Sequence, residues 1–306
     1  MNILITGANG FVGTYFSNYL RDRGHCIRCA IRNESRAIEG FDNVTIENMS
    51  SSDAWRPALE NIDAVIHLIA KTHSLSRNRI DEEADYTAVN VDITRALCEA
   101  IKTSSVQHLI FMSSVKVHGE TSGNEPISEG SPLAPKDVYG RTKRLAEQMV
   151  ESLLKYNKTQ YTIVRPPLIL GDETKGNLAL LEKSIRKGYP LPFARMQNKR
   201  SLVTVQTLAA FVAACLHYPH LSQGAFLVAD RPAQSTKAII QTIGHKIGIK
   251  PRLFYMPKFI LSILFNLIGR RDLVDKLLRN LELDASRSNE LLRLFREGAG
   301  KIADSR

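Results

Sequence analysis

The stretch "TGANGFVG" (residues 6–13) decides the fold, because it places three glycines between an apolar strand and an apolar-periodic helix. Gly7 permits a tight turn, and Gly10 has no side chain, so a pyrophosphate can approach the backbone. Gly13 lets the helix pack closely on the strand. The helix N-terminus offers N–H groups and a partial positive charge to phosphates. This order of strand, loop and helix predicts a dinucleotide site.

Strands and helices alternate through the first half of the chain. Apolar strands are expected at residues 2–6, 26–32, 43–47, 63–69, 108–114 and 161–165. The alternation predicts an α/β fold with a Rossmann-type, doubly wound parallel sheet covered by helices on both faces. After residues 165–171 the rhythm changes, and helical segments fill 237–283. We expect a dinucleotide-binding domain over 1–166 and a smaller, mostly helical substrate domain over 167–306, with 206–230 crossing back onto the first sheet.

The composition is that of an ordinary globular protein, with 43% hydrophobic and 24% charged residues and a net charge of +10. This charge suits nucleic acid, anionic lipid or phosphorylated ligands, but no basic run with interleaved aromatic residues is present, so nucleic acid is not expected. Cys26 and Cys29 form a CxxC, yet they would face opposite sides of a strand, so no metal is expected. Scattered thiols and the lack of a secretion signal predict a cytoplasmic location.

The end of the second expected strand bears on which dinucleotide binds. NAD sites usually carry an Asp or Glu there for the ribose hydroxyls. This chain has Arg32 in that place, with Arg28 nearby. Because an arginine there can accommodate a 2′-phosphate, NADP is favoured. NAD and a plain surface arginine stay open as alternatives.

A second pattern lies in "DVYGRTKRLAE" (137–147). Tyr139 and Lys143 stand one helical turn apart, where side chains are neighbours, which by itself is also common by chance. Ser114 ends an expected strand, at the edge of the sheet where open α/β folds bind ligands. The three side chains are therefore candidates for one site.

These residues carry a family resemblance. The motifs "TGANGFVG", "HLIA", "NVDIT", "FMSSVKVHG" and "VYGRTK" resemble the extended short-chain dehydrogenase/reductases, in the nucleotide-sugar epimerase/dehydratase branch. The segments "NKRSLVTV", "GAFLVADRPAQST" and "LRNLELDAS" are similar, more loosely, to bacterial UDP-sugar 4-epimerases and UDP-4-keto-6-deoxy-HexNAc 4-reductases of O-antigen and capsule precursor synthesis. The resemblance implies an NAD(P)-dependent enzyme acting on a UDP-sugar, and we expect a homodimer.

The resemblance also implies a role for each matching residue. Tyr139 would be the general base or acid, Ser114 would hydrogen-bond the reacting oxygen, and Lys143 would lower the pKa of the tyrosine and hold the nicotinamide ribose. A phenolate at pH 7 requires a lowering of the free tyrosine pKa worth about 4 kcal/mol. Expected substrate contacts are Ser114, Asn177 and Arg200, whose fork suits a diphosphate. Expected cofactor contacts are Gly7, Asn9, Gly10, Phe11, Val12, Gly13, Arg32, Asn48, Met49, His67, Leu68, Ala70, Lys71, Asn90, Tyr139 and Lys143.

Departures from the family pattern reduce the number of reactions that we expect. Val115 and Lys116 replace the Asp-Glu pair of dehydratases, so 4,6-dehydration is not expected. Lys116 also stands two residues after the serine, where epimerases usually have a Thr, and His118 replaces a usual Tyr. We expect hydride transfer at C4 of a UDP-hexose, and Arg32 favours reduction of a UDP-4-keto-6-deoxy-HexNAc. The alternatives are a UDP-glucose or UDP-GlcNAc-type 4-epimerase and a non-catalytic NAD(P)-binding scaffold, against which the intact catalytic set argues.

Two segments near the C-terminus are unusual. "PKFILSILFNLIGRR" (257–271) is apolar with basic flanks and too short to span a bilayer, so it is either a peripheral membrane contact or a buried helix of the substrate domain. The family's terminal "GW-x-PP" segment is missing, and "NELLRLFREGAGKIADSR" (289–306) stands in its place. A shortened and poorly ordered end is expected there.

Overall fold

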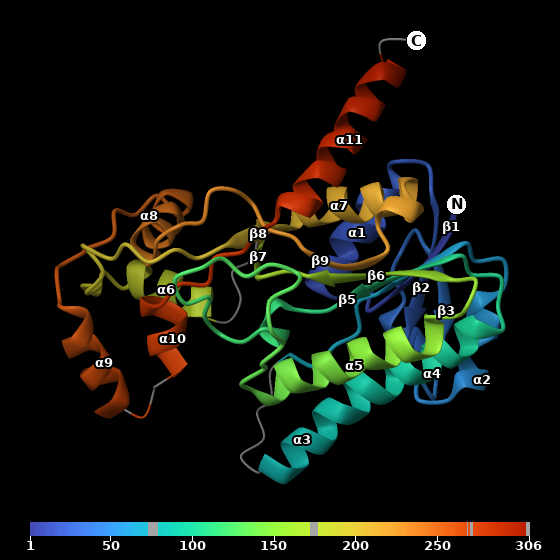
Figure 1. Cartoon of the computed structure of the whole chain (residues 1–306), viewed down its shortest axis with the longest axis horizontal. Helices are drawn as coiled ribbons and strands as arrows, with labels where there is room; N and C mark the ends of the chain where they lie inside the picture. Colours follow the sequence, from blue (N-terminus) through green and yellow to red (C-terminus); the bar gives the residue numbers. More distant parts are fainter. Residues whose placement is uncertain (73–78, 172–176, 268, 270–271, 304–306) are drawn as a thin grey trace.

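A parallel sheet of seven strands forms the centre of the computed structural model, which describes residues 1–72, 79–171, 177–267, 269 and 272–303 (Figure 1). The strand order is β3-β2-β1-β4-β5-β6-β9, and every pairing in this sheet is parallel. The strands are β1 (Asn2–Thr6), β2 (Cys26–Ile31), β3 (Asp42–Thr45), β4 (Ala64–His67), β5 (His108–Met112), β6 (Gln160–Arg165) and β9 (Gly224–Leu227). The order reverses at β1, between β2 and β4, which is where such sheets bind ligands beyond the carboxyl ends of the strands.

Helices cover both faces of this sheet, so the predicted α/β architecture is confirmed. Figure 1 shows α7 (Val205–His217) and α11 (Ser286–Ala303) on one side and α4 (Ile93–Lys102) and α5 (Val138–Leu154) on the other. The first face also carries α1 (Phe11–Arg21), and the second carries α2 (Ser52–Trp55). Strands covered on both faces need continuous apolar runs, and Ile3, Leu4 and Ile5 are accordingly all fully buried.

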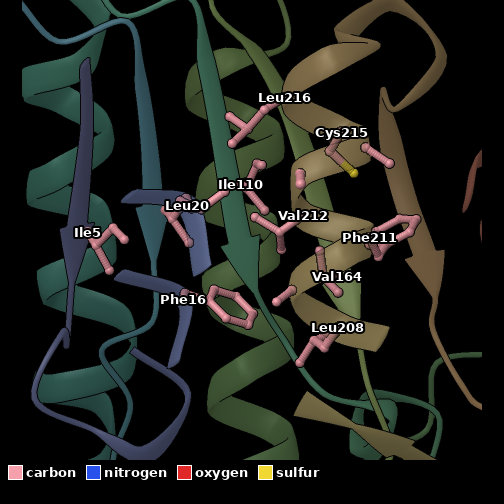
Figure 2. Close-up of a cluster of buried hydrophobic side chains, with 14 of the residues drawn as sticks. Ile5, Phe16, Leu20, Ile110, Val164, Leu208, Phe211, Val212, Cys215 and Leu216 are labelled. Atoms are coloured by element: carbon pink, nitrogen blue, oxygen red, sulfur yellow. The ribbon is translucent and has the colours of Figure 1, made fainter. Parts of the chain in front are cut away.

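Apolar side chains fill the core between the sheet and helices α1, α7 and α11. Figure 2 shows Ile110 and Val164 of the strands in the same apolar layer as Phe16 of α1 and Phe211 of α7. The burial of each such side chain stabilises the fold by about 1.5–3 kcal/mol. This face therefore anchors the glycine loop, which lies between β1 and α1.

The second half of the chain builds a smaller unit beside the carboxyl edge of the sheet. A two-stranded parallel sheet pairs β7 (Leu168–Leu170) with β8 (Leu202–Thr204). Its helices are α6 (Asn177–Arg186), α8 (Thr236–Lys246), α9 (Lys258–Leu267) and α10 (Asp272–Leu278). They share an apolar core that includes Leu181, Phe193 and Ile240. The segment 206–230 returns to the large sheet, because β9 pairs with β6. A boundary between two domains at 166/167 stays a proposal.

The C-terminal end corrects one expectation. Residues 286–303 form α11, and Leu291 and Leu292 are buried in the core that α7 shares. The apolar spacing of this segment thus serves packing on the sheet domain. The remaining elements are α3 (Arg79–Thr87), the π-helix η3 (Ala88–Asp92) and the 3₁₀ turns η1 (Glu34–Arg36), η2 (Pro57–Leu59), η4 (Val115–Val117) and η5 (Pro219–Leu221).

Candidate active site

The glycine loop between β1 and α1 has the backbone geometry that the sequence predicts. Gly7 has φ +68°, and a Cβ there would press on the backbone of Leu68 and Ile69 at 3.1–3.3 Å. A Cβ on Gly13 would overlap the Gly7 carbonyl oxygen. The loop therefore turns tightly, and α1 lies close against it, only because both side chains are absent.

Space for a phosphate lies above Gly10. A Cβ on Gly10 would meet only the Gly7 oxygen, at 3.2 Å, so the direction in which it points is otherwise open. Thr14 donates the first helical hydrogen bond to Gly10 at 2.9 Å, so the N–H groups of Val12 and Gly13 have no acceptor within the helix. No acidic residue lies in the first turn of α1. This end of the helix fits a pyrophosphate.

The other loop residues pack around this space. Asn9 is exposed and donates to the Arg36 carbonyl oxygen at 3.0 Å, and Val12 is half-buried. The Phe11 ring packs directly on Gly171, where a Cβ would overlap it. The loop is thus held between η1 and the segment after β7.

Arg32 and Arg28 differ in their surroundings, which corrects part of the cofactor argument. Arg28 is committed to structure, because its Nε donates to Asp42 at 2.6 Å and its Nη1 to the backbone oxygens of Ala58 and Glu60. Arg32 is exposed directly after β2 and has no ion pair within the described part of the chain. The 2′-phosphate hypothesis therefore rests on Arg32 alone.

Asn48 and Met49, which follow β3 in the chain, were also expected at the cofactor. Asn48 is exposed, and its side-chain oxygen accepts from the backbone of Ser50 at 3.2 Å. Met49 is buried, and its carbonyl oxygen accepts from the Trp55 indole at 2.8 Å. Contact of either residue with the adenosine stays a prediction.

His67 lies fully buried at the end of β4. Its two ring nitrogens face the hydroxyls of Thr6 at 2.7 Å and Thr94 at 3.0 Å, and its ring stacks on Phe111. Burial lowers the pKa of His67 to about 3, so the ring is neutral at physiological pH. Its observed bonds connect β1, β4 and α4, and its contact with the cofactor stays a prediction.

Asn90 connects the segment after β4 to the helix that carries Tyr139. Its Oδ1 accepts from the Lys71 N–H at 2.7 Å, and its Nδ2 donates to the Lys71 oxygen at 3.2 Å and to Thr142 at 3.0 Å. Asn90 lies in the π-helix and is fully buried. Leu68 and Ala70, also expected near the cofactor, are half-buried just before Lys71. Asn90 thus fixes Lys71 relative to α5 and supports the site.

The structure brings Ser114, Tyr139 and Lys143 to the same edge of the sheet. Ser114 lies just past β5 and caps η4, with its Oγ accepting from the Lys116 N–H at 3.3 Å. Asp137 caps α5 by accepting from Gly140 at 2.7 Å, which places Tyr139 in the first turn. Lys143 follows one turn later on the buried side of α5.

Lys143 is a buried ammonium that lacks a partner. It is 1% exposed, and its Nζ has no hydrogen-bond acceptor among the residues that the structure describes. The nitrogen lies 4.1 Å from the centre of the Phe111 ring. Burial lowers the pKa of Lys143 to about 7. An orphaned donor here fits the hydroxyls of a nicotinamide ribose.

The pKa of Tyr139 differs from the expectation. Burial raises the pKa of Tyr139 to about 12, although the charge of Lys116 and the hydroxyl of Ser114 lower it. Lys143 was expected to lower this pKa, but its ammonium lies over Phe111 instead. In this structure the nearby cation is Lys116, whose Nζ lies 5.9 Å from the centre of the Tyr139 ring.

The two expected substrate residues, Arg200 and Asn177, lie in the smaller unit, just before β8 and at the start of α6. Arg200 donates through Nη1 to the backbone oxygens of Asp275 at 2.9 Å and Arg279 at 3.3 Å, just before the chain enters β8. Burial lowers the pKa of Arg200 to about 10, and the nearby Glu120 raises it, so the guanidinium stays charged at pH 7. Asn177 begins α6, but its side chain lies outside the described residues.

A cavity of about 840 Å³ lies in the smaller unit. The basic side chains of its lining are Arg195, Lys237 and Lys258. The other lining residues are Pro192, Ala194, Met196, Gln197, Ser235, Tyr255 and Met256. None of the three catalytic candidates is part of this lining.

Comparison with known proteins identifies the family. The model of the NAD dependent epimerase/dehydratase family matches residues 3–228. The chain belongs to this family. It is 31% identical over 296 residues to a UDP-glucose 4-epimerase of Vibrio cholerae, which covers 95% of this chain and 89% of the relative.

Further matches agree with that assignment. The N-acetyl-alpha-D-glucosaminyl-diphospho-ditrans,octacis-undecaprenol 4-epimerase of Escherichia coli O157:H7 is 27% identical, over 84% of this chain and 75% of the relative. The fold matches MoeE5 in complex with UDP-glucuronic acid and NAD, with a TM-score of 0.73, 19% identity and coverage of 95% and 92% of the two chains. The resemblance seen in the sequence is confirmed: this is an NAD(P)-dependent nucleotide-sugar enzyme of the extended short-chain dehydrogenase/reductases.

For a member of this epimerase/dehydratase family, the surroundings of Lys116 are the main feature that the sequence did not reveal. Its Nζ donates to Asp137 at 2.5 Å and pairs with Glu120 at 2.9 Å. Although burial lowers it, the pKa of Lys116 is raised by these two carboxylates, so Lys116 stays charged. Tyr86, whose ring centre lies 6.4 Å from that of Tyr139, was also missed. A lysine two residues after Ser114 was the available signal.

A buried ion pair positions α5 beneath this site. Glu147 is fully buried and accepts two hydrogen bonds from Arg165 at 2.8 Å and one from Ser113 at 2.6 Å. The Nε2 of His118 lies 3.1 Å from Arg165 Nη1, and its Nδ1 lies 3.2 Å from the Pro132 oxygen. His118 therefore helps to hold the end of β6.

Proposed function

We propose that the protein is a 4-epimerase that acts on a UDP-sugar. The observation that carries this proposal is the convergence of Ser114, Tyr139 and the unpartnered Lys143 beside the glycine loop, in a chain whose near-full-length relative is named for UDP-glucose 4-epimerisation. A dehydratase would need an acid–base pair after Ser114, and Val115 and Lys116 cannot provide it.

The residues divide the chemistry at C4 between them. A bound nicotinamide supplies a reversible acceptor for the C4 hydride. Tyr139 exchanges the proton of the C4 hydroxyl, and Ser114 donates a hydrogen bond to the same oxygen. Bringing the pKa of Tyr139 from about 12 to 7 requires about 7 kcal/mol from nearby positive charge. The effect of the Lys116 charge is already contained in the value of about 12, so the further lowering has to come from the positive charge of the bound oxidised nicotinamide. Arg200 would pair with the diphosphate.

A UDP-4-keto-6-deoxy-HexNAc 4-reductase is the second candidate. The observation in its favour is Arg32, which is exposed after β2 and has no ion pair in the described ranges, so that it is free to meet a 2′-phosphate. The named activities of the Vibrio cholerae and Escherichia coli relatives favour the epimerase instead. Because the second of these acts on an undecaprenol-linked sugar, synthesis of O-antigen or capsule precursors belongs to the proposal, together with the expected cytoplasmic homodimer.

The experiment that separates these candidates measures cofactor consumption. An epimerase converts UDP-glucose or UDP-GlcNAc to the C4 epimer, seen by NMR, with no net change in nicotinamide absorbance. A reductase oxidises one NADPH for each UDP-4-keto-6-deoxy sugar that it reduces.

Replacement of Tyr139 tests whether the site is catalytic at all. Tyr139→Phe removes only the phenol oxygen, so turnover should fall by about 10²–10⁴ while cofactor affinity is kept. Tyr156→Phe, on an exposed side chain just beyond α5, is the matched control and should behave as wild type. Wild-type protein that binds cofactor but converts none of the UDP-, dTDP- or GDP-sugars would favour the scaffold alternative.

A further inference from the structure

The segment around α9 collects the exposed apolar surface of the molecule. Of the fourteen large hydrophobic side chains that are exposed in the described part of the chain, seven lie between residues 254 and 267. They are Phe254, Tyr255, Phe259, Ile260, Ile263, Leu264 and Leu267. Scattered apolar side chains on a surface are ordinary, but a contiguous set of this size indicates a surface that binds something.

The exposed side chains of α9 form one stripe. Phe259, Ile263 and Leu267 recur every four residues, and Ile260 and Leu264 lie beside them, so all five share one helix face. Leu261 is the buried residue of this helix, and Phe265 is half-buried in the core of the smaller unit. The interpretation of 257–271 as a buried helix therefore fails for the described residues 258–267.

Basic side chains lie at the N-terminal end of this stripe. Residues 231–271 contain eight Lys or Arg and no Asp or Glu, in a chain whose net charge is +10. The 840 Å³ cavity brings the basic side chains of Arg195, Lys237 and Lys258 together at the start of α9. Arg195 also lies over the exposed Tyr255 ring, 4.9 Å from its centre. Apolar side chains beside basic ones match an anionic lipid surface.

We propose that α9 binds the surface of an anionic bilayer, with its axis along the membrane plane and its exposed stripe in the acyl boundary. A ten-residue helix is about 15 Å long, half of the hydrocarbon thickness, so it can lie in the interface but cannot cross it. No described helix of the chain has the length and apolar character of a membrane span. Figure 1 places α9 at the end of the molecule remote from β2 and β3, so the sheet domain would face away from the lipid.

A second copy of the chain is a poorer occupant of this surface. A symmetric pair would bring the same basic segment of both copies together, and no acidic residue within 231–271 could neutralise the contact. A bilayer that contains anionic headgroups supplies the missing negative charge. The inference does not depend on which sugar the enzyme takes, and its test uses no sugar.

Sedimentation with lipid vesicles tests the proposal. We expect the wild-type protein to bind vesicles of phosphatidylcholine and phosphatidylglycerol, and to bind less to pure phosphatidylcholine and in 1 M salt. Ile263→Glu should reduce binding about tenfold, because a charge enters the apolar boundary. Leu221→Glu is the matched control, since Leu221 is 54% exposed and Ile263 55%, and it should bind as wild type.

Two further measurements keep the test decisive. Leu267→Glu, at a side chain that is 79% exposed at the end of α9, repeats the test if Ile263→Glu melts at a lower temperature than wild type. Light scattering reports the mass of each variant in solution. Absence of wild-type binding to the anionic vesicles, or equal losses in the Ile263 and Leu221 variants, would overturn the proposal. A changed mass of Ile263→Glu with unchanged vesicle binding would also overturn it, because the face would then contact another copy of the chain.

Discussion

The two sides of Tyr139 differ in how their lysines are neutralised. On the side of the glycine loop, Lys143 is buried with no acceptor among the described residues, and burial lowers its pKa to about 7. On the side of Arg200, Lys116 is held by Asp137 and Glu120, which raise its pKa. A buried ammonium without a partner is costly unless a ligand supplies one, whereas a doubly paired ammonium is a permanent charge. We therefore propose that the cofactor completes the first side, whereas the second is organised by residues of the chain itself.

Gly10→Val should break the cofactor side with the largest effect. Gly10 has φ −77° and ψ 163°, which valine adopts readily, so the loop should fold. The branched side chain would fill the open space above the loop, and NAD(P)H affinity should fall by about 100-fold or more. Fluorescence titration of NADH measures the loss, and UDP affinity by calorimetry should be unchanged.

Gly130→Val provides the control for that measurement. Gly130 lies between η4 and α5 in the chain, and a Cβ there would meet only the Ser128 hydroxyl at 4.0 Å. Its NADH affinity should equal that of wild type. If Gly10→Val binds NADH as tightly as the control, the glycine loop is not the pyrophosphate site.

Lys143→Met should raise the stability of the protein but lower its activity. The folded-state pKa of about 7 lies below the unfolded value near 10.5, so the unfolded chain binds more protons between these values and wild-type stability rises with pH across this window. At pH 7 the methionine variant escapes this penalty and should be more stable by up to about 5 kcal/mol, while turnover falls by about 10². The stability difference should shrink as pH rises towards 10.5.

Thermal melts between pH 6 and pH 10 measure this difference. Lys102→Met, at an exposed lysine at the end of α4, should show no such dependence on pH. A Lys143→Met variant that is less stable than wild type at pH 7 would mean that the ammonium has a partner in solution. The contrast between the two lysines would then be lost.

Lys116→Met should produce a smaller change, on the substrate side. Without this cation the pKa of Tyr139 rises further, so activity that depends on the phenolate should move to higher pH by about one unit. At pH 7 the rate should fall about tenfold, whereas Lys116→Arg keeps the charge and should keep the wild-type profile. The pH dependence of kcat is the measurement. Identical profiles for the Met and Arg variants would leave Lys116 as a structural ion pair only.

The same two lysines show what could be predicted from the sequence. Lys143 follows from local rules, because a spacing of four residues after Tyr139 on a helix fixes its place, and the strand–loop–helix order fixes the glycine loop. In the sequence, Lys116 stood out only because it differs from the residue that the family usually has at this position. Its role depends on Glu120 and Asp137, and Asp137 is 21 residues away in sequence and is brought close by the turn before α5. Charge networks between loops leave no periodic signal in a sequence.

The burial of two helices could not be predicted from the sequence either. Residues 206–218 and 257–271 are both apolar, yet nine residues of α7 are buried and one of α9 is. Helix α7 lies against the large sheet, whereas α9 has only the small core of the second unit on one side. Apolar composition predicted a helix in each place, but the partner that covers it depends on topology.

The smallest expected effect concerns Arg32, which decides whether the cofactor side distinguishes NADP from NAD. Its exposed guanidinium after β2 would form charge-assisted hydrogen bonds with a 2′-phosphate, so Arg32→Ala should weaken NADPH about tenfold and leave NADH nearly unchanged. Arg56→Ala, at an exposed arginine that pairs with Asp53, controls for the loss of one surface charge and should weaken neither. Parallel titrations of both cofactors give the ratio directly. If NADPH and NADH weaken equally, or if the wild type prefers NADH, Arg32 does not read the phosphate, and the only structural observation that favours the reductase is removed.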